Sequence, residues 1–166
     1  MKKIIFVAIL FSSIFASANL VNSAWTGKTN LFINDKLHCS DDSSDKAPVL
    51  NPADGYFTLH KGGKNLIWAY IGSGCAMGWN NEYMPFQVVE NKLTDESGNI
   101  VGNISKLSIE AKNFYSERKK FFIESLVINT NDLEKLTVTM SYTQAASPKK
   151  YKFIGIYTRH HDSVWP

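Results

Sequence analysis

Cysteine is scarce in this chain: Cys39 and Cys75 are the only two in 166 residues. A domain of this length can bury a real hydrophobic core, so its fold does not depend on many disulfides. In an oxidising compartment an isolated pair most often forms one bond. We therefore predict a Cys39–Cys75 disulfide, worth roughly 3–4 kcal/mol in the chain-entropy model. Two buried free thiols, or a reactive thiol at Cys75, are the alternatives.

The chain also lacks a marked excess of either charge. It has 18 basic and 15 acidic residues, and Lys2 and Lys3 fall in the N-terminal segment discussed next, so residues 19–166 carry 16 and 15. Nucleic-acid binding usually needs a clear basic excess. We therefore expect no nucleic-acid partner.

Long apolar runs are absent, except at the N-terminus. Residues 4–14 are interrupted only by Ser12 and Ser13, which is too short for the roughly 20 residues of a membrane-spanning helix. The run follows a basic start and precedes Ala16-Ser17-Ala18, the small-residue pattern that signal peptidases accept. We predict a signal peptide over 1–18, with cleavage after Ala24 as a second choice. Residues 19–166 would then form one secreted or periplasmic domain without a membrane span.

What the chain does have is many short β-like segments with turn residues between them. Their spacing of about ten residues predicts an all-β fold, an antiparallel barrel or sandwich of about eight or nine strands. The helical spacing of Leu107, Ala111 and Phe114 leaves an α+β alternative, with one helix near 106–118. The predicted strands cover residues 25–33, 56–60, 66–71, 86–93, 100–111, 119–129, 136–142 and 151–158.

One loop, residues 72–85, stands out as a candidate site. It is long and rich in glycine, and such loops on a rigid scaffold often carry binding residues. Its large side chains are costly to leave in water, which argues against disorder. The predicted ligand- or partner-binding residues are Met77, Trp79, Tyr83 and Met84.

These features predict a non-enzymatic binding protein that holds a small apolar or aromatic ligand. Closed barrels of about eight strands can hold one such ligand, and Tyr56, Trp68 and Tyr70 could line its walls or simply fill the core. The alternative is a protein-recognition module, such as an inhibitor, an adhesin-like domain or a secreted effector, that uses loop 72–85. No cofactor is implied. No metal is implied either, since the acidic stretch 41–45 lacks the glycine and distal glutamate of an EF-hand.

Two short stretches resemble known families. Ser73-Gly74-Cys75-Ala76-Met77 resembles the Ser-His-Gly-Cys-x-Arg stretch of the exported L,D-transpeptidases. The resemblance would imply a cysteine-dependent cell-wall enzyme, but the histidine is missing and Met77 replaces the arginine. Without an adjacent base, a thiol is a poor nucleophile at neutral pH.

The second resemblance concerns the two ends of the domain. Trp25-Thr26-Gly27 and Arg159 resemble the lipocalin arrangement, in which a tryptophan near the first strand stacks on a late arginine. The family's Gly-x-Trp order is reversed here. The resemblance implies that the first and last strands are neighbours, with a Trp25–Arg159 contact.

Overall fold

The structure is a computed structural model, and part of the chain is described in it. The described parts are residue 20 and residues 23–42, 56–62, 65–71, 83–132, 134–145 and 147–160. Every described element is a β-strand, which confirms the all-β prediction. No helix capable of crossing a bilayer occurs in these segments.

The described strands number eleven, more than the eight or nine that we predicted. One addition is the strand that ends at Asp42, and two predicted strands are each divided by a turn, one at Glu90 and Asn91 and one at residues 105–107. The strands are β1 (Ser23–Ile33), β2 (Lys36–Asp42), β3 (Tyr56–Gly62), β4 (Leu66–Ile71), β5 (Met84–Val89), β6 (Lys92–Thr94), β7 (Ile100–Ile104), β8 (Ser108–Tyr115), β9 (Phe121–Thr130), β10 (Lys135–Gln144) and β11 (Ser147–His160).

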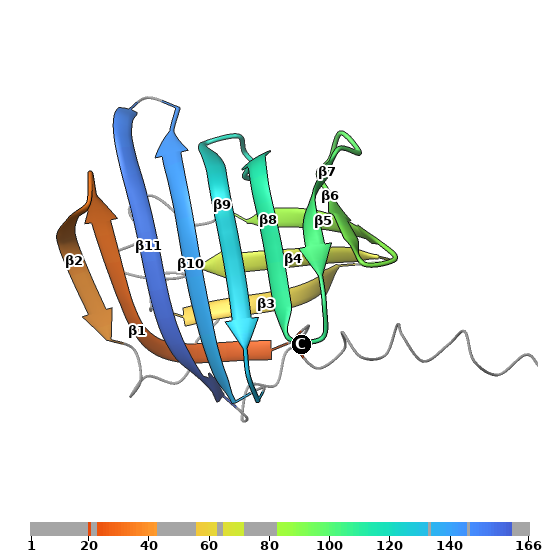
Figure 1. Cartoon of the computed structure of the whole chain (residues 1–166), viewed down its shortest axis with the longest axis horizontal. Coiled ribbons are helices and arrows are strands. Elements are labelled where there is room, and N and C mark those ends of the chain that lie inside the picture. Colours follow the sequence, from red (N-terminus) through yellow and green to blue (C-terminus); the bar gives the residue numbers. More distant parts are fainter. Residues whose placement is uncertain are drawn as a thin grey trace, which may run out of the picture.

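All strand pairs are antiparallel, and the hydrogen-bonded order is β11-β10-β9-β8-β7-β6-β5-β4-β3-β1-β2. β1 also pairs along its other edge with β11, from Ala24 opposite His160 to Ile33 opposite Tyr151. The ladder therefore returns to its starting strand, and the sheet is barrel-like. Figure 1 shows it flattened into two layers, with β8 to β11 in front of β3 and β4.

Gly27 is the point at which β1 changes partner. Before it, residues 23–26 pair with β3; after it, residues 28–33 pair with β2. A Cβ at Gly27 would lie 2.1 Å from the Ile156 carbonyl oxygen on β11, closer than real atoms approach. A glycine is needed here because the two backbones approach so closely.

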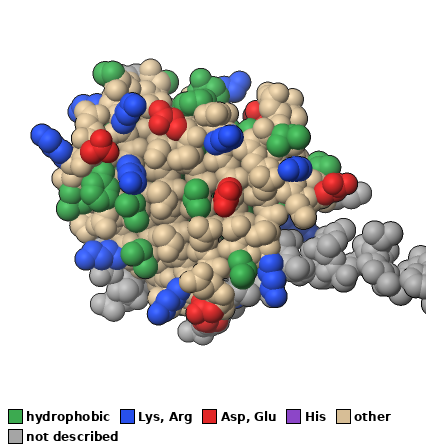
Figure 2. All heavy atoms as spheres, viewed as in Figure 1, with side chains coloured by type: hydrophobic (Ala, Val, Ile, Leu, Met, Phe, Trp, Pro, Cys, Tyr) green, Lys and Arg blue, Asp and Glu red, His purple; other side chains and the backbone are tan. Residues whose placement is uncertain are grey.

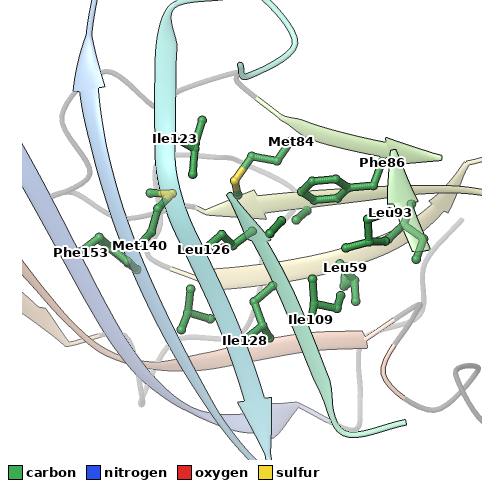
Figure 3. Close-up of a cluster of buried hydrophobic side chains, with 14 of the residues drawn as sticks. Leu59, Met84, Phe86, Leu93, Ile109, Ile123, Leu126, Ile128, Met140 and Phe153 are labelled. Carbon is green, nitrogen blue, oxygen red and sulfur yellow. The ribbon is translucent and has the colours of Figure 1, made fainter. Parts of the chain in front are cut away.

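The inward side chains form one hydrophobic core. The largest fully buried members include Trp25, Phe86, Phe121, Tyr142 and Phe153. Figure 3 shows Met84 and Phe86 from β5 directed toward Ile123 and Leu126 of β9, so the two layers pack on each other. Inward and outward residues alternate along strands such as β10, which supplies one face of side chains to this packing.

The contact between the first and last strands is confirmed. Trp25 lies opposite Arg159 in the β1–β11 register, and the guanidinium carbon is 5.9 Å from the centre of the Trp25 ring. The indole Nε1 donates to Ser23 Oγ at 2.7 Å, and Ser23 Oγ donates to the Leu20 carbonyl oxygen. The fully buried Trp25 side chain thus contacts Ser23 near the start of β1 and Arg159 near the end of β11.

The helix considered over residues 106–118 does not form, because this segment contains β8. Ile109 and Ala111 point inward with period two, but the next inward residue is Phe114, three positions later. Asn113 lies between them with φ 57°, in the left-handed region, and shifts the phase of the strand. This kink produces the three-residue spacing of Ala111 and Phe114, whereas Leu107 lies before β8 and is exposed.

Candidate functional site

The predicted loop site is described only at its end. Met77 and Trp79 lie outside the described residues, as does Cys75, so their roles and the Cys39–Cys75 bond stay predictions. Tyr83 is half-buried, and its ring meets the edge of Trp68 at 5.8 Å. Met84 begins β5 and is fully buried, which places it in the core and not on a surface.

The described residues also line a groove, which shares only Pro85 with loop 72–85. Its volume is about 430 Å³. Its position is between the β6–β7 turn and the end of β8, toward the upper right of Figure 1. The lining residues are Pro85, Asp95, Glu96, Ser97, Asn99, Asn113, Phe114, Tyr115, Ser116 and Lys119. The volume falls within the range of small-molecule sites, about 300–1,000 Å³.

The floor of the groove is apolar. Pro85 and Phe114 are both buried, and the Phe114 ring meets the Phe86 ring edge to face, with centroids 5.0 Å apart. β5 and β8 are not neighbours in the sheet, because β6 and β7 lie between them. The contact between Phe86 and Phe114 therefore joins β5 to β8 and holds the Phe114 side chain in place at the groove.

One wall is the turn between β6 and β7, organised by Asp95. Its carboxylate accepts hydrogen bonds from the backbone amides of Ser97 and Asn99, each at 2.9 Å, and from Asn99 Nδ2 at 3.1 Å. Partial burial raises the pKa of Asp95, but the hydrogen bonds from Asn99, Ser97 and Gly98 outweigh it, so the pKa lies below its ordinary value. This carboxylate is therefore ionised at neutral pH. Its oxygens already accept hydrogen bonds from within the turn.

The opposite wall is the end of β8 with the turn that follows it. Ser116 exchanges backbone hydrogen bonds around this turn: its amide donates to the Phe121 carbonyl at 3.0 Å, and its carbonyl accepts from Lys119 at 2.8 Å. The Glu117 amide donates to the Tyr83 carbonyl at 2.9 Å, which ties the turn to the start of β5. Asn113 and Lys119 both have positive φ, at 57° and 55°. Two lining residues thus adopt a backbone conformation that is costly outside glycine.

Several polar side chains in the groove remain open to a ligand, among them those of Glu96, Asn113 and Lys119. Within the described segments, the side chains of Glu96, Asn113 and Lys119 make no hydrogen bond or ion pair with the protein, and all three are exposed. They offer a carboxylate, an amide and an ammonium group. Tyr115 also borders the groove, but it follows the inward Phe114 in β8. Its side chain is 54% exposed, and its ring packs against Phe122 with centroids 5.1 Å apart.

Sequence reasoning missed this groove. Residues 95–99 fall between two predicted strands and were given no functional role, and the segment around Asn113 was considered only as part of a helix. The lining comes from three separate stretches of chain, and no local motif connects them. The left-handed backbone of Asn113 shapes this end of β8. A single asparagine in a strand-like segment does not reveal that conformation.

The rest of the described surface is mixed. Figure 2 shows Lys and Arg side chains interspersed with Asp and Glu on the face formed by β8 to β11, with hydrophobic side chains scattered among them. No three His, Cys, Asp or Glu side chains in the described segments gather closely enough to hold a metal ion.

Comparisons with known proteins identify no family. No protein-family model matches the chain, and no curated protein matches it. Among solved structures, the chain is similar to a Bacteroides fragilis NCTC 9343 protein with a provisional outer-membrane designation. The TM-score is 0.47 at 9% identity, over 86% of this chain and 52% of that one, so the chain spans about half of that protein's length. A similarity this distant carries no argument about function.

Proposed function

We propose that the protein is exported, loses residues 1–18, and binds a small ligand in the groove without catalysing a reaction. It would act in the periplasm or outside the cell. The observation that carries the proposal is the groove itself, with a buried apolar floor beneath exposed polar groups that have no partner among the described residues. Binding sites combine an apolar surface with a few placed polar groups in this way.

The folded core favours cleavage after Ala18 over cleavage after Ala24. Leu20 is fully buried, and Ser23 and Ala24 are buried in β1, opposite Leu59 and Thr58 of β3. Cleavage after Ala24 would remove all of these contacts, together with the hydrogen bond from Trp25 Nε1 to Ser23. Cleavage after Ala18 preserves every one. N-terminal sequencing of the exported protein should begin at Asn19, and a start at Trp25 would contradict the argument.

The groove also changes the kind of ligand that we propose. Its lining combines the apolar residues Pro85 and Phe114 with the polar side chains of Glu96, Asn113 and Lys119. The ligand should therefore have both an apolar surface and hydrogen-bonding groups. The protein-recognition alternative depends on loop 72–85, of which only residues 83–85 are described.

Binding can be tested on the domain of residues 19–166 with a library of small neutral fragments. Chemical shifts of the ¹⁵N-labelled protein would be followed during titration. The proposal expects at least one fragment to perturb the amides of residues 95–99 and 113–119 together. A library in which every binding fragment perturbs other regions, or in which none binds, would contradict it.

A further inference from the structure

We propose that one end of the barrel-like sheet binds the surface of an anionic lipid bilayer. The surface consists of three segments at strand ends, residues 34–36, 116–120 and 147–150, with the outward side chains that border them. We call this surface the basic rim. It is a second binding surface, independent of the ligand proposed for the groove, and only Lys119 belongs to both.

Backbone hydrogen bonds hold the three segments of the basic rim side by side. The Asn34 amide donates to the Lys150 carbonyl oxygen at 2.9 Å. The Ala145 amide, in the turn before β11, donates to the Lys120 carbonyl oxygen at 3.3 Å. In Figure 1 the same segments lie along the upper edge of the sheet. Residues far apart in the sequence therefore form one continuous surface.

The basic rim is strongly positive, although the domain as a whole is nearly neutral. Its three segments contain six basic residues and two acidic ones, out of 16 and 15 in residues 19–166, so the remainder of the domain is net negative. The six basic side chains are all exposed: Lys36, Arg118, Lys119, Lys120, Lys149 and Lys150. Figure 2 shows several Lys and Arg side chains along this upper edge.

The opposite end of the sheet has the reverse balance. Its turns at residues 105–107 and 131–134 lie together, because the Thr130 amide donates to the Leu107 carbonyl oxygen at 2.9 Å. These two turns contain one basic residue and two acidic ones. The positive charge is thus concentrated at one end of the molecule, which gives it a preferred orientation toward an anionic surface.

Aromatic side chains border the positive charges on the outer face. A row of paired residues crosses four strands, with each residue opposite the next: Tyr115, Phe122, Thr143 and Lys150. The Tyr115 side chain is 54% exposed, and its ring packs on that of Phe122. An exposed aromatic pair therefore lies in the same row as a rim lysine.

A second row begins on β2 and has the same mixed character. Leu37 directly follows the rim segment 34–36 and is 60% exposed. It lies opposite Phe32, which lies opposite Lys152 on β11. Phe32 is half-buried and Lys152 is exposed. Apolar and basic side chains thus adjoin at both sides of the rim.

This combination fits a lipid surface better than a soluble polyanion. A polyanion needs positive charge alone, and it would leave Tyr115 and Leu37 in water. At a bilayer, Lys and Arg side chains contact anionic head groups, while aromatic and aliphatic side chains enter the interfacial region. Each Lys or Arg close to an anionic membrane strengthens binding about fivefold.

Cosedimentation of the domain of residues 19–166 with lipid vesicles tests the proposal. One set of vesicles contains equal parts of phosphatidylglycerol and phosphatidylcholine, and the other contains phosphatidylcholine alone. We expect binding to the anionic vesicles and at least about fivefold weaker binding to the neutral ones. Raising the salt from about 0.1 M to 1 M shortens the Debye length from about 10 Å to 3 Å and should release most of the bound protein.

The double variant Lys149→Gln/Lys150→Gln tests whether the basic rim is the surface that binds. Neither residue lines the groove, whereas Lys119 shares it with Asp95 and Glu96. Glutamine keeps an exposed polar side chain and leaves the backbone hydrogen bond between residues 34 and 150 intact. We expect affinity for the anionic vesicles to fall about 25-fold, at about fivefold for each lysine.

The matched control is Lys106→Gln/Lys135→Gln. Both lysines are exposed, and they lie in or beside the turns at the opposite end of the sheet. The change in net charge is the same, so a rim-specific interaction predicts affinity within about twofold of the wild type, because distant charges are screened. Thermal unfolding of both double variants should match the wild type, which excludes loss of folding as the cause.

Leu37→Ser separates a bilayer from a soluble polyanion. Loss of its apolar contact should weaken binding to anionic vesicles about fivefold, with the salt dependence unchanged. Val89→Ser is the control, since Val89 is 58% exposed at the end of β5, outside the basic rim. Dextran sulfate serves as the soluble polyanion, and we expect it to bind Leu37→Ser and the wild type equally.

Each adverse result would overturn the inference. Absence of binding to anionic vesicles at about 0.1 M salt would refute it directly. Equal vesicle affinities of the two lysine double variants would show that the rim is not the surface. If Leu37→Ser bound vesicles as tightly as Val89→Ser, charge alone would account for the binding, and the bilayer would be the wrong partner. None of these results bears on the fragment titration of the groove.

Discussion

Replacing Gly27 by alanine tests whether the first and last strands really pack as closely as the structure shows. The added Cβ would lie 2.1 Å from the Ile156 carbonyl oxygen, 2.7 Å from Tyr157 Cα and 2.9 Å from the Ile156 carbonyl carbon. All three are backbone atoms, so no side-chain rotation relieves the contact. Overpacking by one methyl group costs about 1–3 kcal/mol, occasionally more. Because β1 must move away from β11, we expect about 3 kcal/mol or more.

The assay is urea unfolding followed by tryptophan fluorescence, with thermal unfolding as a second measurement. At about 2–4 °C for each kcal/mol, the melting temperature should fall by roughly 6–12 °C. Lys28→Ala is the control, because Lys28 is exposed on the same strand and should shift the free energy of unfolding by less than about 0.5 kcal/mol. An unchanged melting temperature for Gly27→Ala would refute the close β1–β11 approach.

Three further predictions concern named contacts. Arg159→Met should lower the free energy of unfolding by roughly 0.5–2 kcal/mol through loss of the Trp25 contact, and a change no larger than that of Lys28→Ala would contradict this. Asp95 has a lowered pKa in the folded state, so its contribution to stability is present above the unfolded value and is lost as the pH falls through the folded value. The difference in urea midpoint between wild type and Asp95→Asn should therefore shrink below pH 3.8; a difference that grows in acid would reverse the sign. Thiol titration of the native exported protein should find neither Cys39 nor Cys75 free, and two reactive thiols would exclude the bond.

Much of the fold was predictable because local patterns and turn residues agree. Residues 136–142 alternate cleanly, and in β10 their apolar members Leu136, Val138, Met140 and Tyr142 are all buried. Asn34 and Asp35 directly follow the predicted strand 25–33, and both adopt the positive φ that tight hairpin turns require, at 48° and 64°.

The errors arise where one residue changes the phase of a strand. At Asn113 the left-handed backbone separates the inward residues Ala111 and Phe114 by three positions, and periodicity alone interprets this as a helix. On β9 the inward residues Ile123 and Leu126 show the same spacing directly opposite. Such paired shifts depend on the neighbouring strand, so a single segment of sequence cannot reveal them.

The groove was beyond sequence reasoning for a related reason. Its walls come from the β6–β7 turn and the end of β8, and its floor from Pro85 and Phe114. These segments come together only in the folded sheet. There β6 and β7 lie between β5 and β8 in the strand order, while Phe86 of β5 and Phe114 of β8 are in contact. Loop 72–85, by contrast, stood out because it contains large apolar side chains. Their presence shows that exposing the loop to water would be costly, but it does not show where the loop lies in the fold.

The most direct test of the binding account is a crystal structure of residues 19–166 soaked with the small neutral fragments that bind in the titration. The account predicts a fragment in the groove, with polar atoms bonded to Glu96, Asn113 or Lys119. Fragments bound only on other faces of the domain, or an empty groove at saturating fragment concentrations, would contradict it.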